Sequence, residues 1–512
     1  MAQNISTGEA FAIIVINTLL FLSILALTLF MSSKTEKIIC SVILVISILP
    51  GTIFLGYLLF AHVLLERNSI TSLFETNPEE SKEFLVYYLN TWIVLGVSFY
   101  ALLPAVMVGL MRSFKKLSIH AHKKLFFVSL TVVLAIVFIP KLSQSVYFIN
   151  FYNTFISYKI RIKKEHIGIT NRQKMPYEVR STVSDSIPQT LVVVIGESLT
   201  RSHMQIYGYG RPTTPLLSAK GDSISVYKDV VSPQVHTIPV IRSVFSLADN
   251  CNTSYFIEKP SLFELFNRAG YDTYFISNQA FGGRMGTSYD VLLNLAQYKY
   301  DLSSENKHDE VVLDNLTKAL ETKYNKNRLI VIHLIGNHMA YKFRYPPQFA
   351  KFDNKKDHFI EQKEYIDNMV EDAIDQYDNS VLYNDYVVNK IMNLLIEKGG
   401  NKTAMIYFSD HAEELFDYRK FAGHAYEKLS PYMCEVPFIL WTSNDFMHQR
   451  TDLEINTSRS YSTGDFLYSI SNLAGIEYQD YDSSRSLFST EFTPRERFIG
   501  EVSYKDLVVK RK

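Results

Sequence analysis

The sequence predicts a chain in two parts: a region of membrane-spanning helices, followed by an α/β domain whose mostly parallel sheet carries helices on both faces. Two observations support this prediction. Apolar runs long enough to cross a bilayer fill most of the first 140 residues. After residue 190, short apolar segments alternate with segments of helical periodicity, which is the pattern of parallel strands joined by crossover helices.

Four apolar runs are expected to cross the membrane: residues 10–31, 38–65, 84–111 and 125–148. A fifth span hidden in one of the longer runs would change only the side on which the N-terminus lies. The loop at 112–124 contains five lysine and arginine residues, so the positive-inside rule places it in the cytoplasm. Everything after residue 148 then lies outside the cytoplasmic membrane.

Residues 149–189 are expected to connect the spans to the α/β domain, which occupies residues 190–512. The first part of this segment interleaves aromatic residues with four basic ones between Lys159 and Lys164. That composition fits a helix lying along the membrane surface, and it fits a plain connector equally well. The second part is polar and contains Pro176, as expected for a linker.

Three segments of the α/β domain have the composition of strands buried on both faces, and each precedes residues of the kind that bind metals. These are 191–196 before Glu197, 329–336 before Asn337 and His338, and 404–409 before Asp410 and His411. Open α/β sheets build their sites beyond the carboxyl ends of the strands, so we expect these side chains to meet. Glu197, Asp410 and His411 supply two carboxylates and an imidazole, a ligand set that Zn²⁺ accepts.

The remaining elements alternate along the chain. A capping box at Ser261 and Glu264, with Gly270 beyond it, predicts one short helix. Further helices are expected at 379–398 and near 463–474, and further strands at 273–277 and 437–441. The charged stretch 349–374 has no clear period and is expected to be an excursion near the strand end at His338.

Thr237 is the candidate for a fourth ligand that is also a nucleophile. It lies in a proline-flanked loop that enters a helix, and a helix N-terminus favours an anion such as phosphate. A threonine hydroxyl is a poor nucleophile until a metal stabilises its alkoxide. Composition alone favours a different role for Thr237, as the N-cap of the helix. Ser232 and Thr253 are weaker candidates without such a setting.

Five sequence blocks occur in one order before the strand segment VPFILW: GESLTRSHMQIYGYGRPTTP, VSPQVHTIPVIRSVFSLAD, HLIGNHMAYKFRYP, YDNSVLYNDYVV and FSDHAEELF. With the apolar region before them, they resemble the membrane-anchored phosphoethanolamine transferases of Gram-negative bacteria, which belong to the alkaline phosphatase/sulfatase superfamily. The resemblance implies an α/β domain of that superfamily's fold.

The resemblance also implies roles for individual residues. Glu197, Thr237, Asp410 and His411 would hold a catalytic zinc ion, and the Thr237 hydroxyl would become modified with phosphoethanolamine. His338 and His424 match two further histidines of the family, which hold the transferred phosphate group or a second zinc ion. From the residues alone, we would expect His338 in a turn at a strand end and His424 in a loop.

The implied donor is phosphatidylethanolamine, and the implied acceptor is lipopolysaccharide, at a core heptose or at lipid A. The implied location is the bacterial inner membrane, with the catalytic domain in the periplasm. The 52 basic and 52 acidic side chains balance, and no basic stripe or metal-finger spacing is present, so the sequence gives no indication of nucleic acid binding.

The chain departs from the family pattern at three features. Ala412 replaces the usual glycine after Asp410 and His411, which costs roughly 1 kcal/mol if the backbone there needs a positive φ. Ser198 replaces the usual threonine. Of three cysteines, Cys40 lies in an apolar run, which leaves Cys251 and Cys434 as one disulfide pair or as two free thiols. This sparse use of cysteine is closer to family members that modify the lipopolysaccharide core.

Other activities fit the sequence less well. A sulfatase needs a cysteine or serine where Thr237 stands, with an arginine one place earlier than Arg242. A phosphoglycerol transferase shares the threonine and metal chemistry and differs in the head group of its donor. A catalytically inactive membrane-anchored scaffold is the alternative from a different class, but it would not need the complete set of candidate site residues. A transporter would be expected to carry more spans and buried charges within them.

Overall fold

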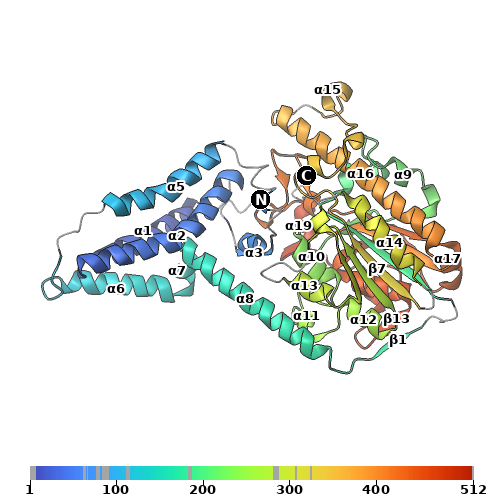
Figure 1. Cartoon of the computed structure of the whole chain (residues 1–512), viewed down its shortest axis with the longest axis horizontal. Coiled ribbons are helices and arrows are strands. Elements are labelled where there is room, and N and C mark those ends of the chain that lie inside the picture. The colour runs from blue at the N-terminus through green and yellow to red at the C-terminus, as the bar shows by residue number, and fades with distance from the viewer. Residues whose placement is uncertain are drawn as a thin grey trace. The chain divides into compact units, whose positions relative to one another are not determined.

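The computed structural model describes residues 7–61, 65, 67–76, 81–82, 91–110, 116–182, 187–280, 287–305, 308–322, 326–361 and 363–509. The chain divides into two compact units, Met1–Arg161 and Ile162–Lys512 (Figure 1).

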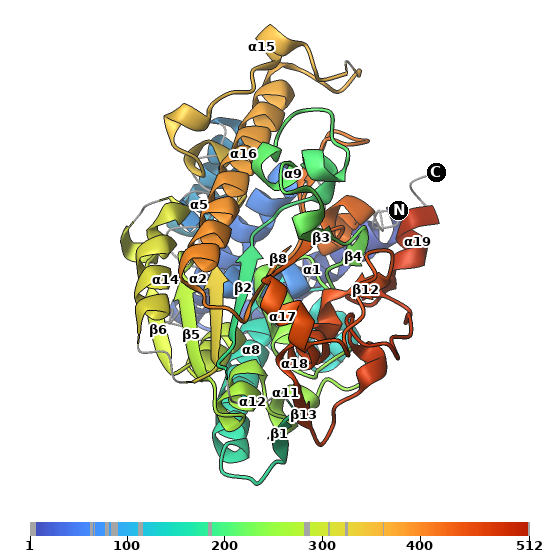
Figure 2. The same cartoon turned by 90° about the vertical axis from the view of Figure 1, so that its right-hand side faces the viewer.

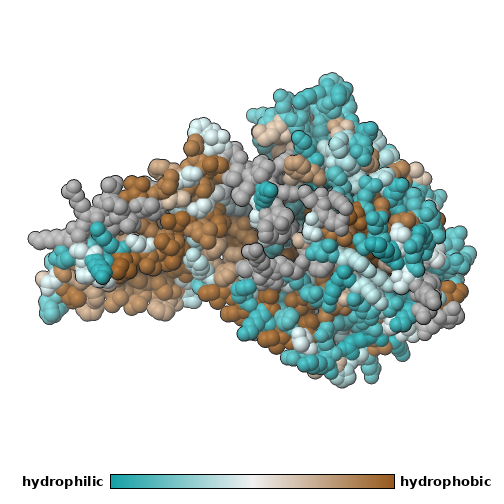
Figure 3. Space-filling model, in the orientation of Figure 1, coloured by the Kyte–Doolittle hydropathy of each residue, from teal (hydrophilic) through white to brown (hydrophobic). Residues whose placement is uncertain are grey.

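The first unit is helical. Its described helices are α1 (Thr7–Thr28), α2 (Ser33–Ala61), α3 (Arg67–Glu75), α5 (Thr91–Leu110), α6 (Lys123–Phe138), α7 (Pro140–Gln144) and the first part of α8 (Tyr147–Arg172). Many apolar side chains of this unit are exposed (Figure 3). Among them, Phe11 is 67% exposed and Trp92 is 81% exposed. A soluble protein rarely exposes so much contiguous apolar surface, so these helices suit a lipid environment.

In the described residues, two helices are long and apolar enough to cross a membrane, over Phe11–Thr28 and Ser33–Leu59. They correspond to the first two predicted spans. The third prediction starts in residues 83–90, which lie outside the described residues, and the described apolar part of α5 is the shorter Thr91–Leu102. The fourth run is divided between α6 and α7 because Pro140 restricts the residue before it to an extended conformation. The total number of spans stays a prediction.

Helix α8 covers the segment predicted as a surface helix or a connector and continues to Arg172. The predicted linker then contains a short strand, β1 (Val179–Ser181), which pairs with β13 (Ile476–Tyr478). The Arg172 guanidinium is buried and ion-pairs with Glu264 at the start of α12 (Leu262–Arg268). The end of α8 is therefore an integral part of the second unit.

The second unit is built on a sheet with seven strands in the described residues. Their order is β3 (Ile224–Val226), β11 (Phe438–Thr442), β8 (Thr403–Ser409), β2 (Thr190–Gly196), β7 (Arg328–His333), β5 (Asp272–Ser277) and β6 (Tyr298–Asp301). The strands from β8 to β6 are parallel, which confirms a mostly parallel sheet. The predicted strand at 437–441 is β11, and it runs antiparallel to both of its neighbours.

Strand β2 shows why the sheet is covered on both faces. Val193 and Ile195 pack into a core with helices α10 (Thr237–Val244), α12, α13 (Ser288–Leu293) and α18 (Phe466–Ala474). Val192 and Val194, which point the other way, pack against α14 (Val312–Glu321) and α16 (Asn368–Lys398) (Figure 2). Continuous apolar strands are typical of parallel sheets with two covered faces, and each buried side chain contributes roughly 1.5–3 kcal/mol.

The predicted capping box is present, because Ser261 and Glu264 bond reciprocally at the start of α12 and Gly270 beyond it has a φ of +85°. Helix α16 begins at Asn368, behind the N-cap Asp367, so the last part of the predicted excursion at 349–374 is helical. All three cysteines lie in the described residues and are free thiols, so Cys251 and Cys434 do not form a disulfide.

Short elements complete the second unit: α9 (Pro215–Ser218), β4 (Asp229–Val231), α11 (Tyr255–Glu258), α15 (Asn354–Asp357), β9 (Glu414–Leu415), β10 (Ala422–Gly423), α17 (Asn444–Gln449), β12 (Ser460–Ser462), β14 (Phe498–Ile499), β15 (Val502–Ser503) and α19 (Tyr504–Val509).

Candidate active site

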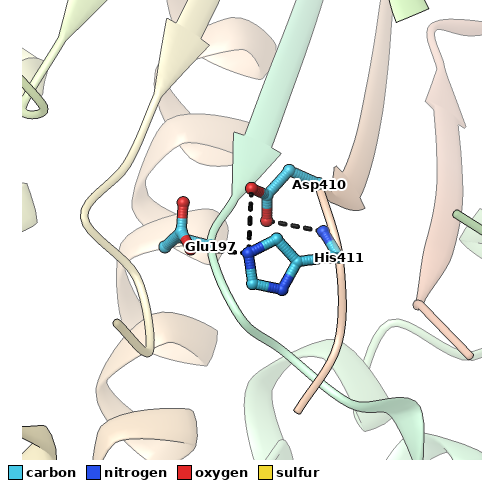
Figure 4. Close-up of side chains that lie close together, drawn as sticks. All are labelled: Glu197, Asp410 and His411. Atoms are coloured by element: carbon cyan, nitrogen blue, oxygen red, sulfur yellow. Dashed lines mark hydrogen bonds and ion pairs between the residues drawn. The ribbon is translucent and has the colours of Figure 1, made fainter. Parts of the chain in front are cut away.

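The carboxyl ends of β2 and β8 bring three predicted side chains together. Gly196 pairs with Ser409, so Glu197 and Asp410 leave the sheet side by side, with His411 next to them. The ligand atoms of these three residues lie within 4.8 Å of one another, and all three side chains are buried (Figure 4). His411 Nε2 is 3.2 Å from Glu197 Oε1 and 3.5 Å from Asp410 Oδ2.

Asp410 and His411 are each held through one atom and present another to the cluster. Asp410 Oδ1 accepts the backbone N–H groups of Ser198 and His411, at 3.2 and 2.6 Å. The imidazole Nδ1 of His411 lies 3.1 Å from the carbonyl oxygen of Ala412, which favours a proton on Nδ1 and turns Nε2 toward the two carboxylates. Asp410 Oδ2 and His411 Nε2 are buried and have no hydrogen-bond partner among the described residues.

Two buried ligand atoms that face one another without a hydrogen-bond partner among the described residues suit a bound cation, because buried polar atoms are otherwise paired. Burial alone would lower the pKa of His411, but the Asp410 and Glu197 carboxylates outweigh it and raise the pKa to about 10. The two carboxylates thus attract positive charge to this point. The donor set of two carboxylates and an imidazole fits Zn²⁺.

The backbone conformations of Gly336 and Ser198, which adjoin Glu197, support its position. Gly336, in the turn after β7, has a φ of +49°, and a Cβ atom there would lie 2.7 Å from the Glu197 nitrogen. Ser198 has a φ of +54°, which is uncommon for a residue with a side chain. The Tyr377 hydroxyl holds it by donating to its carbonyl oxygen at 2.7 Å. Strained residues of this kind concentrate at functional sites.

The backbone at Ala412 does not meet the condition under which an alanine there would be costly. Ala412 is fully buried and is not one of the residues with positive φ in the described part of the chain. The glycine-to-alanine departure therefore carries no penalty of backbone conformation.

Thr237 lies beside Glu197. It is the first residue of α10 and His236 is the N-cap, so the interpretation of Thr237 as the N-cap is wrong. The Thr237 hydroxyl instead donates to Glu197 Oε2 at 3.1 Å. The Ser232 hydroxyl donates to the Gln234 carbonyl oxygen, and Thr253 is exposed.

His338 and His424 lie next to the group of three. The ring centroids of His424 and His411 are 4.2 Å apart, and His338 is close enough to Glu197, His411 and His424 to interact with their charges. Burial lowers the pKa of His338 to about 4 and that of His424 to about 3, so both imidazoles are neutral at pH 7. The Nδ1 atom of each has no hydrogen-bond partner within the described chain.

Three further residues belong to the site, and none of them was predicted as a site residue. Glu413 is buried with Oε1 3.7 Å from His424 Nδ1, and burial raises its pKa to about 8. The His236 ring centroid is 5.0 Å from that of His424. Gln279 Nε2 donates to Glu197 Oε2 at 2.8 Å. Gln279 lies two residues after β5, so the rule that sites form beyond strand ends could have found it.

Comparisons with known proteins identify the family of the chain. The sulfatase family model matches residues 189–476, more than half of the chain. Phosphoethanolamine transferase EptC of Escherichia coli K12 is 29% identical over 531 residues, which cover 96% of this chain and 89% of the relative.

Solved structures show the same likeness. The C-terminal periplasmic domain of Escherichia coli EptC is 30% identical, with a TM-score of 0.61, over 66% of this chain and 98% of that domain. Its complex with Zn has a TM-score of 0.59 at 30% identity, over 65% of this chain and 98% of that domain.

An integral membrane protein of known structure has the same fold. The integral membrane lipooligosaccharide phosphoethanolamine transferase A of Neisseria meningitidis shares it at 19% identity, with a TM-score of 0.69 over 89% of this chain and 87% of that one. The chain therefore belongs to the sulfatase family and, within it, to the membrane-anchored phosphoethanolamine transferases.

Proposed function

We propose that this protein transfers phosphoethanolamine from phosphatidylethanolamine to lipopolysaccharide, through a covalent intermediate on Thr237 at a zinc site. One observation supports this most directly. The Thr237 hydroxyl donates to Glu197, the carboxylate that meets the orphaned Asp410 Oδ2 and His411 Nε2. A hydroxyl at that place adjoins both a cation site and a helix N-terminus, which together suit a nucleophile that attacks phosphate.

The residues that would hold zinc are Glu197, Thr237, Asp410 and His411. A bound Zn²⁺ would stabilise the Thr237 oxygen as an alkoxide and offset the negative charge on the transferred phosphate. His338 and His424 would bind oxygens of the phosphate group through their unpartnered nitrogens, or hold a second zinc ion.

The reaction has two halves. In the first, Thr237 Oγ forms a bond to the donor phosphorus, the bond from phosphorus to the glycerol oxygen breaks, and diacylglycerol leaves with the hydroxyl proton. In the second, an oxygen of the acceptor forms a bond to the same phosphorus, the bond from phosphorus to Thr237 Oγ breaks, and the proton that the acceptor loses restores the Thr237 hydroxyl. The N-terminal N–H groups of α10 favour the phosphate in both halves. A covalent intermediate lets one site serve two lipid-borne substrates in turn.

We also propose the organisation of the chain in the envelope. Residues 1–148 would cross the bacterial inner membrane in four spans, residues 149–189 would connect them to the catalytic domain, and residues 190–512 would lie in the periplasm. The two long apolar helices and the fold shared with an integral membrane protein support this arrangement.

Mass spectrometry of lipid A and core oligosaccharide tests the function. Cells that lack the gene would be complemented with the wild-type chain, with Thr237→Ala, or with Ser232→Ala as a control hydroxyl that is bonded to the backbone. We expect the phosphoethanolamine increment to return with the wild type and with Ser232→Ala, and to be lost with Thr237→Ala.

The fragment that carries the increment identifies the acceptor. If the added group is phosphoglycerol, the donor is a phosphoglycerol lipid and not phosphatidylethanolamine. No increment on any lipopolysaccharide fragment would refute the acceptor, and an increment that Thr237→Ala restores in full would refute the nucleophile.

A further inference from the structure

Glu197 contacts a side chain that the reaction described above does not use, the carboxamide of Gln279. Gln279 follows β5 and is 8% exposed. Its Nε2 donates to Glu197 Oε2 at 2.8 Å and to the carbonyl oxygen of Leu334 at 2.9 Å. We infer that Gln279 is a positioning residue for the metal centre, which holds Glu197 so that one carboxylate oxygen, Oε1, faces Asp410 and His411.

The orientation of the Gln279 carboxamide follows from its two oxygen acceptors. An NH₂ group has two hydrogens, and the oxygens of Glu197 and Leu334 take one each. Exchanging the amide oxygen and nitrogen would set an oxygen against both acceptors, so the hydrogen-bond network excludes that orientation. The side chain therefore presents a donor to Glu197 and cannot present an acceptor.

A second set of contacts keeps Gln279 in place. The Ser277 hydroxyl accepts the Gln279 backbone N–H at 3.0 Å and donates to the Gln279 carbonyl oxygen at 2.8 Å. His333, which is fully buried, lies with Nε2 3.2 Å from the carboxamide nitrogen and with Nδ1 2.5 Å from the Tyr289 hydroxyl. Because its NH₂ group is held by two oxygen acceptors and its backbone is held by Ser277, the carboxamide acts as a rigid donor.

The two Glu197 oxygens consequently have different surroundings. Oε1 is 3.2 Å from His411 Nε2 and accepts the Ser198 hydroxyl at 2.9 Å, whereas Oε2 accepts from both Thr237 and Gln279. In the proposed reaction, on which this step rests, Thr237 becomes a phosphoester and has no hydroxyl proton to donate. Gln279 is then the remaining side-chain donor to Oε2 in the described site, and it keeps Glu197 oriented through both halves of the reaction.

Zinc affinity of the full chain in detergent micelles tests this inference. Gln279→Met keeps the length of the side chain and removes the donor. Removing a hydrogen bond that orients a metal ligand typically lowers metal affinity about 10–100-fold. We therefore expect a loss of that size in Gln279→Met.

Gln189→Met is the matched control. Gln189 is fully buried, and its Nε2 donates to the Ala474 carbonyl oxygen at 2.7 Å and bonds the Tyr271 hydroxyl. It precedes β2, whereas Glu197 follows that strand. We expect Gln189→Met to lower the unfolding temperature and to leave zinc affinity unchanged.

Cobalt(II) in place of zinc gives a second measurement. The visible absorption of cobalt(II) is intense with four ligands and weak with five or six. A Glu197 released from Gln279 can bind with both oxygens, so absorption per bound cobalt should weaken in Gln279→Met. Equal zinc affinity and equal cobalt spectra in Gln279→Met and wild type would overturn the inference alone. Equal losses of zinc affinity in Gln279→Met and Gln189→Met would do the same. A wild-type chain that binds no zinc would overturn the proposed function with it.

Discussion

Gly336 places the main chain of the turn after β7 directly against Glu197. A Cβ atom at Gly336 would lie 2.7 Å from the Glu197 nitrogen, 3.0 Å from its carbonyl oxygen and 3.2 Å from its Cβ. Neither backbone can yield independently, because the Asn337 N–H donates to the Glu197 carbonyl oxygen at 2.9 Å. Gly336→Ala should therefore displace Glu197 from Asp410 and His411.

The cost of this substitution has two parts, and the chain offers a control that separates them. Gly221 has nearly the same φ, +51° against +49°, but no described atom lies within 4 Å of its would-be Cβ. Gly221→Ala should cost about 1 kcal/mol for the left-handed conformation. Gly336→Ala pays that cost and a further overpacking cost of about 1–3 kcal/mol. We expect a total of about 2–4 kcal/mol.

The assay compares thermal unfolding, zinc affinity and phosphoethanolamine transfer of the two variants in the full chain. A displacement approaching 1 Å at a catalytic group can reduce the rate about 100-fold. Transfer should fall steeply in Gly336→Ala and remain near wild type in Gly221→Ala. If both variants unfold at the same temperature and transfer at the wild-type rate, the close approach does not determine the position of Glu197.

Two further predictions address the surroundings of the site. Ala412→Gly should leave transfer unchanged and lower stability by roughly 0.5–1 kcal/mol, because Ala412 needs no positive φ; a clear gain of activity would show that the alanine is a strained replacement. His203 Nδ1 is 2.8 Å from Asp378 Oδ1, and although burial lowers the pKa of His203, the Asp378 carboxylate outweighs it and raises the pKa above its ordinary value. A raised pKa means that the stabilisation is complete below about pH 6.5 and is lost as the pH rises through the folded value. The difference in unfolding temperature between wild type and His203→Gln should therefore shrink as the pH rises from 6 to 9, and a constant difference would contradict a charged His203.

The sequence was sufficient for the central strands and for the residues at their ends. Strands β2, β7 and β8 are short apolar runs bounded by polar residues, and such runs have one low-energy place, between two layers of helices. The rule that parallel strands end at the same edge then predicted that Glu197, Asp410 and His411 meet, and the structure confirms it. The capping box at Ser261 is equally local, since both of its hydrogen bonds join residues three apart.

Other features depended on contacts between distant segments. The apolar run of β11 has the same composition in either direction, so only pairing with β8 and β3 determines that it is antiparallel. The start of α16 at Asn368 follows a charged stretch with no period, where the hydrophobic pattern gives no signal. Cys251 and Cys434 were compatible with a disulfide by number alone, but one is exposed, the other is buried, and both are free.

The residues that contact the candidate metal ligands show most clearly what the sequence determines and what the tertiary structure decides. A glutamine after a strand has no periodic signal, and its role depends on which strand lies beside it. Because β7 separates β5 from β2, Gln279 can reach both the Leu334 carbonyl and the Glu197 carboxylate. The sequence by itself thus determined which residues end the strands, since hydrophobic runs and their polar ends are local properties. Only the tertiary structure decided which donors surround those residues, because hydrogen bonds between segments depend on strand order and on the path of the backbone between them.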